Sequence, residues 1–110
     1  MTGEVEGSSD FLHVNVYTNN IQPESPYLLM VWNHGGGWQT VSPSTDIYGP
    51  DYLIEMNVTV VTFNYRHGAF GFRSLDDGNL YVPGNQAFKD QRMALRWVQV
   101  EIFSVIEWKR

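Results

Sequence analysis

The chain has 110 residues, 43% of them hydrophobic, so it holds one domain at most and is too apolar for a disordered tail. Its formal net charge is −5 with both signs interspersed, which argues against nucleic acid or an anionic membrane as a partner. It has no cysteine, which excludes disulfides and thiolate metal sites.

Residues 1–9 are polar and acidic, and they predict a flexible leader without the apolar core of a signal peptide. The sequence as written therefore favours a cytoplasmic protein; a secreted one is the alternative if the true N-terminus is missing. The longest apolar run, Tyr27 to Trp32, is too short to span a bilayer. Asn57-Val58-Thr59 matches the acceptor triplet for N-glycosylation, but such triplets often arise by chance, and the sequence alone favours that interpretation.

Three segments predict strands, and a fourth predicts a short helix. Residues 12–17 alternate apolar and polar side chains, the pattern of a half-buried strand. The continuous apolar run of residues 27–32 predicts a strand covered on both faces. A short helix starts at Pro50, and residues 58–63 form a second buried strand rich in β-branched side chains. Strand, helix and strand in this order predict a parallel pair of strands.

Residues 66–84 are rich in glycine and aspartate and predict an irregular connection. A long helix follows, with Asn85 as the expected N-cap. The apolar stripe of this helix is predicted to consist of residues at helical spacing, namely Phe88, Leu95, Val98 and Ile102.

The triplet Gly35-Gly36-Gly37 follows a buried strand directly, and His34 precedes it. Three successive glycines are costly in a regular element but let backbone N–H groups approach a ligand closely. In α/β-hydrolases a loop of this composition donates N–H groups to the oxyanion of a tetrahedral intermediate. The motif by itself suits a plain glycine-rich turn equally well.

The chain also resembles the type-B carboxylesterases, the family that includes cholinesterases and insect juvenile hormone esterases. Five blocks carry the resemblance in family order: residues 9–17 (SDFLHVNVY), 30–38 (MVWNHGGGW), 48–54 (YGPDYLI), 60–72 (VVTFNYRHGAFGF) and 83–98 (PGNQAFKDQRMALRWV). The resemblance implies an α/β fold in which residues 10–99 are the N-terminal part of an α/β-hydrolase domain. It also implies that the parent enzyme hydrolyses small carboxylic esters through a serine, without a metal or cofactor.

The resemblance assigns roles to particular residues. The backbone N–H groups of Gly36 and Gly37 would be oxyanion donors, and Gly35 would shape their loop. His34 would brace that loop. Arg66 and Asp90 would form a structural ion pair. His13 and His67 have no partner by spacing and are expected to be structural, on a strand face and in a loop.

The sequence departs from the family at several places, and the most consequential departure is at its end. Phe11 stands where the family has a cysteine, and His67 replaces an aliphatic residue. Residues 100–110 diverge from the family where its nucleophile strand should begin, which suggests a truncated product. No serine lies in a G-x-S-x-G motif, and no histidine follows His67. The chain should therefore lack activity of its own.

Two alternative interpretations remain open at this stage. One is a non-catalytic adhesion-type relative, and the other is a truncated product without function. In the family, the strand that carries the nucleophile pairs with residues 27–32. Its absence here predicts an exposed apolar edge, with oligomerisation or aggregation of the isolated chain. The opposite face of the sheet would also lack the family's later helices, so Val60, Val61 and Phe63 should be partly exposed.

Overall fold

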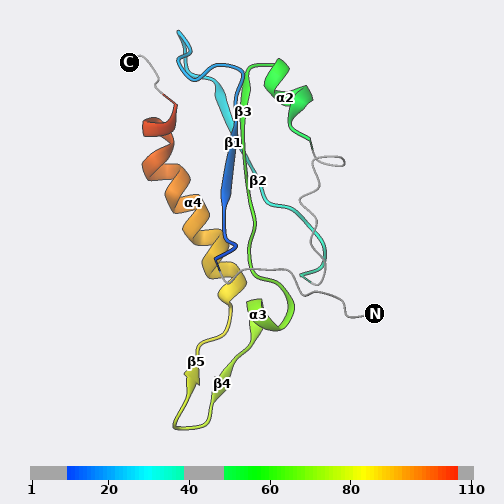
Figure 1. Ribbon diagram of the computed structural model, residues 1–110, viewed down its shortest axis with the longest axis vertical. Helices are drawn as coiled ribbons and strands as arrows, with labels where there is room; N and C mark the ends of the chain where they lie inside the picture. Colours follow the sequence, from blue (N-terminus) through cyan, green and yellow to red (C-terminus); the bar gives the residue numbers. More distant parts are fainter. Residues whose placement is uncertain (1–9, 39–48, 107–110) are drawn as a thin grey trace.

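The computed structural model describes residues 10–38 and 49–106 (Figure 1). Three strands form the main sheet: β1 (Val14–Tyr17), β2 (Leu28–Trp32) and β3 (Val58–Phe63). Their order in space is β1-β3-β2, with β1 antiparallel and β2 parallel to β3. The predicted parallel pair is thereby confirmed. The predicted short helix is α2 (Asp51–Glu55), which lies between β2 and β3; Pro50 is its N-cap and so stands just before the first turn in which the proline was expected.

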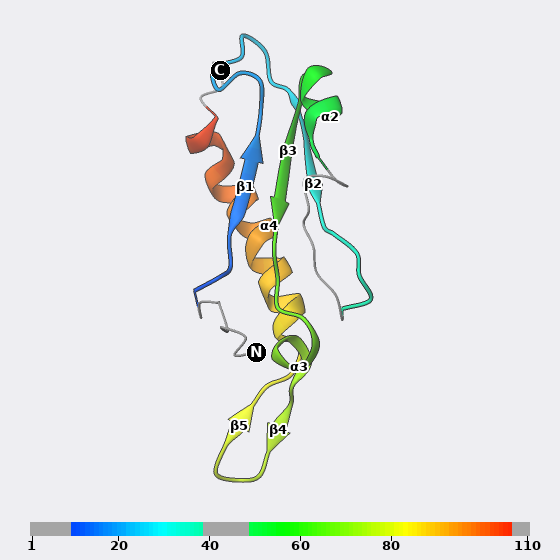
Figure 2. The ribbon, with the colours of Figure 1, turned by 45° about the vertical axis from the view of Figure 1, so that its right-hand side comes forward.

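The long helix α4 (Gln86–Val105) covers one face of this sheet, as both views show (Figures 1 and 2). Val61 at the centre of β3 is fully buried and packs with three residues of the helix and its C-terminal end, Val98, Ile102 and Ile106. A second cluster joins Phe63 and Tyr65 to Ala87 and Ala94 near the start of the helix.

The stripe predicted for α4 was half wrong. Val98 and Ile102 are buried, but Phe88 and Leu95 are 48% and 52% exposed. Two alanines, Ala87 and Ala94, face the sheet instead. Their small side chains let the helix backbone lie close to its neighbours; a Cβ on Gly71 would stand only 3.1 Å from the Cβ of Ala87.

Two burial predictions were also wrong. Strand β2 is not covered on both faces: Leu28, Met30 and Trp32 are 78%, 42% and 41% exposed. The reason is that β2 lies at the edge of the described sheet and α4 covers only the other face. Conversely Val60, Val61 and Phe63 are each at most 3% exposed, because β3 is the central strand with helices beside it.

Residues 66–84 are more regular than predicted. They contain helix α3 (Gly68–Phe72) and a hairpin of β4 (Leu75–Asp76) and β5 (Tyr81–Val82), which extends away from the sheet (Figures 1 and 2). Asn85 does precede α4, but at φ 64° and without a side-chain capping bond. In the part of the chain that the structure describes, no helix has the length and apolarity needed to cross a bilayer. The expected leader, residues 1–9, lies outside the described residues.

Candidate functional site

The glycine-rich loop leaves the carboxyl end of β2 and borders a cavity of about 380 Å³. Ligands of parallel sheets generally bind at this edge, beyond the carboxyl ends of the strands. The cavity is lined by the loop and by residues that follow β3 or lie on α4, namely Asn33, His34, Gly35, Gly36, Gly37, Trp38, Tyr65, Phe88 and Gln91.

The backbone of the loop requires glycine at two of its three glycine positions. Gly36 and Gly37 have φ of 136° and 60°, where L side chains are strained. Gly35 has no such φ, and a Cβ added to it would meet nothing within 4 Å. Trp38 continues the left-handed path at φ 59°, an unusual conformation for a bulky residue and one found at functional loops.

His34 holds the start of the loop through both its ring and its backbone. It is 4% exposed, and its Nδ1 lies 3.0 Å from the carbonyl oxygen of Gly35. The Tyr65 hydroxyl donates to the His34 carbonyl at 2.9 Å, and the two rings stack with centroids 4.7 Å apart. Burial raises the pKa of Tyr65, although a hydrogen bond with Gln91 opposes the shift. Tyr65 is therefore a neutral donor near pH 7.

His67 belongs to the same stack, which the sequence analysis missed. Its ring lies 4.3 Å from that of Tyr65 and 5.2 Å from that of His34, centroid to centroid. Burial, reinforced by repulsion from His34, lowers the pKa of His67. One signal could have placed these residues together: they follow the carboxyl ends of two parallel strands, which meet at one edge of a sheet.

The other end of the loop is tied to α3 and to an aromatic cluster. The backbone N–H of Gly68 donates to the Trp38 carbonyl at 2.8 Å. The Trp38 ring makes edge contacts with Phe72 and Phe88 at centroid distances of 6.1 and 6.2 Å. Phe88, which the helical spacing places on the apolar stripe of α4, lines the cavity instead and is 48% exposed.

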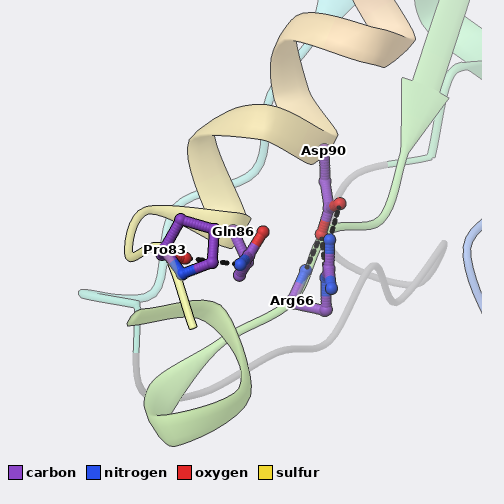
Figure 3. A network of polar contacts seen from close by, with 4 residues as sticks. All are labelled: Arg66, Pro83, Gln86 and Asp90. Carbon is purple, nitrogen blue, oxygen red and sulfur yellow. Dashed lines mark hydrogen bonds and ion pairs between the residues drawn. The ribbon is translucent and has the colours of Figure 1, made fainter. Parts of the chain in front are cut away.

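Arg66 and Asp90 join the end of β3 to α4 (Figure 3). The guanidinium donates from Nη2 to Oδ1 at 2.6 Å and from Nε to Oδ2 at 2.7 Å, and the Arg66 backbone N–H donates to Oδ2 at 3.0 Å. The side chain of Asp90 is 3% exposed and that of Arg66 33%. Burial alone would raise the pKa of Asp90, but the hydrogen bonds and charge of Arg66 lower it below its usual value.

The remaining histidine, His13, is exposed and lies apart from this stack, with Nδ1 3.0 Å from the Phe11 carbonyl oxygen. Among residues 10–38 and 49–106, no group of three or more histidine, aspartate or glutamate side chains could hold a metal ion.

Comparison with known proteins identifies the family. The sequence profile of the carboxylesterase family matches residues 1–105. Esterase B1 of Culex pipiens is 40% identical over 95 residues, and juvenile hormone esterase of Tribolium castaneum is 44% identical over 99. Acetylcholinesterase of Danio rerio is 44% identical over 96 residues. These matches cover 86%, 90% and 86% of this chain but only 18%, 16% and 15% of the respective relatives.

Proposed function

The chain belongs to the carboxylesterase family, and from that premise we propose that its glycine-rich loop supplies oxyanion donors to a carboxylic-ester hydrolase. The backbone N–H groups of Gly36 and Gly37 are the proposed donors. They would stabilise the negative charge on the carbonyl oxygen of a small ester when the tetrahedral intermediate forms. Gly35 is proposed to shape the loop.

The observation that carries the proposal is the loop's position and conformation taken together. Gly36 and Gly37 have positive φ, follow a parallel strand and line a cavity. A plain turn would also require glycine at positive φ. It would not have to line a cavity, or to be hydrogen-bonded at one end to Tyr65 and at the other to Gly68. We propose His34 as the brace of this loop, and the Arg66–Asp90 pair as the structural link that holds the loop's neighbours on α4.

We propose that these 110 residues do not contain the nucleophile. None of the serines lies in G-x-S-x-G, the motif that presents the nucleophile in α/β-hydrolases. Hydrolysis is therefore proposed for a protein that joins this segment to a serine nucleophile, a general acid–base histidine and an acidic residue. This chain alone is proposed to have no esterase activity.

A chimera tests the proposal. Residues 10–99 replace the matching segment of Culex pipiens Esterase B1, which is 40% identical in this region. We expect the chimera to hydrolyse a nitrophenyl acetate and to react with a fluorophosphonate probe. The isolated chain should do neither. Labelling of the isolated chain at any one serine would contradict its proposed silence.

Two glycine variants of the chimera isolate the role of the loop. Gly37→Ala and Gly78→Ala both place a Cβ in open space at positive φ, 60° and 83° respectively, so their conformational cost is matched. Only Gly37→Ala disturbs a proposed donor, and its kcat should fall on the order of 10²-fold. Equal activities of the two variants at equal Tm would rule out the donor role.

A further inference from the structure

Asn57 occupies the turn between α2 and β3 and is exposed. Its φ is 60°, and its backbone N–H donates to the Ile54 carbonyl at 3.1 Å. Asparagine tolerates this left-handed conformation better than most residues. The turn by itself therefore accounts for an asparagine here, whatever residue stands at position 59.

The side-chain oxygen of Asn57 accepts a hydrogen bond. Asn19 donates from Nδ2 to the Oδ1 of Asn57 at 2.8 Å. Since the oxygen and nitrogen of a primary amide point in different directions, this bond leaves the Asn57 Nδ2 directed away from Asn19, on an exposed residue. That nitrogen is the atom that N-glycosylation modifies.

Thr59 completes the one N-x-S/T triplet of the 110-residue sequence. In the folded chain its side chain is fully buried, and its hydroxyl donates to the Thr18 hydroxyl at 3.4 Å. An enzyme that reads the whole triplet could not reach this hydroxyl once β3 has paired with its neighbours.

We infer that Asn57 is an N-glycosylation site, modified before β3 packs, in a protein that passes through the secretory route. The co-reactant is an oligosaccharide linked to a lipid diphosphate. A bond forms between Nδ2 and the sugar C1, the bond from C1 to the diphosphate oxygen breaks, the lipid diphosphate leaves, and Nδ2 loses one proton to the transferring enzyme.

The position of Asn57 keeps such a glycan away from the candidate site. Asn57 precedes β3, whereas Tyr65 and the glycine-rich loop lie beyond its far end (Figure 1). Six strand residues at roughly 3.3 Å each separate them by about 20 Å. The glycan would therefore leave the cavity open, and the inference does not depend on the proposed ester hydrolysis.

The test translates the chain behind a cleavable secretory leader in the presence of endoplasmic reticulum microsomes. Gel mobility is compared before and after digestion with a peptide N-glycanase. Asn57→Asp keeps an oxygen that can accept from Asn19, and Thr59→Val removes the hydroxyl at similar volume; both should abolish the mobility shift. Thr59→Ser keeps the triplet and should retain it.

Timing is tested with the chimera purified from bacteria, which carries no glycan. A solubilised oligosaccharyltransferase and its lipid-linked donor should modify the urea-unfolded chimera and not the folded one. Equal modification of both would overturn the timing. A wild-type chain that stays unshifted while a control glycoprotein is modified in the same microsomes, or a shift that persists in Asn57→Asp, would overturn the site.

Discussion

The two faces of the three-stranded sheet differ sharply. On one face Val61 is 0% exposed where it packs against α4 and Ile106 at the end of that helix. On the other, Val60 of the central strand is 3% exposed, but the β2 side chains Leu28, Met30 and Trp32 are 41–78% exposed. The covered face is closed by α4, which follows β3 after the connection of residues 64–85, so the described part of the chain buries this face by itself. Nothing comparable covers β2 within residues 10–38 and 49–106.

The open face has a simple explanation in the length of the relatives. The chain spans less than a fifth of the length of the curated relatives reported above. Long apolar strand edges are aggregation-prone unless further chain covers them. We infer that the face formed by Leu28, Met30 and Trp32 is a packing surface for the rest of an esterase domain, which the chimera can test.

The largest effect is expected at Asp90, on the helix that covers the sheet. Asp90→Ala would leave the Arg66 guanidinium and backbone N–H without their carboxylate, and breaking a buried pair costs about 3–5 kcal/mol. Urea unfolding of the chimera measures this loss. Glu55→Ala, which removes an exposed carboxylate on α2, is the control and should change stability by less than about 0.5 kcal/mol. A loss under about 1 kcal/mol for Asp90→Ala would mean that solvent screens the pair.

A somewhat smaller effect is expected within the apolar core. Val98→Ala removes two methyl groups from a side chain that is 6% exposed and should cost the chimera about 1.5–3 kcal/mol. Leu95, on the same helix, is 52% exposed, and Leu95→Ala should be nearly neutral. Similar losses of unfolding free energy from both substitutions would show that α4 does not have one buried and one exposed side as described.

The open face should respond differently in two settings. The isolated chain is expected to aggregate or to melt broadly. Leu28→Lys places a charge on an exposed position and should raise its monomeric fraction in sedimentation. In the chimera the same change should destabilise by about 1.5–3 kcal/mol if the added chain buries Leu28. A neutral effect in the chimera would refute the packing surface.

Sequence patterns predicted the strand–helix–strand unit well because β-branched runs, Pro50 and the helical period are local signals. They predicted the helix α4 but only half of its buried stripe. Two overlapping sets of residues share the helical spacing, and Ala87 and Ala94 are too small for hydrophobicity to mark them as the buried set. They also failed for His67, whose stacking on Tyr65 and His34 depends on how the strand ends meet. The three successive glycines identified the loop from the sequence. The hydrogen bonds of Tyr65 and Gly68 to its two ends could be found only from the folded structure.

The smallest effect is the dependence of stability on pH at His67. Because its folded pKa is lowered by burial and by His34, the folded chain binds fewer protons than the unfolded chain below about pH 6.5. The stabilisation is therefore fully present above pH 6.5 and is lost as the pH falls through the folded pKa, with a slope of at most about 1.4 kcal/mol per pH unit. His67→Leu in the chimera should flatten this slope in urea unfolding between pH 7 and 5, as an aliphatic side chain cannot titrate. His13→Leu, which removes an exposed histidine outside the stack, is the matched control. Equal slopes in all three proteins would mean that the stack of His67, Tyr65 and His34 remains open to solvent, so the brace of the loop would be looser than its ring distances imply.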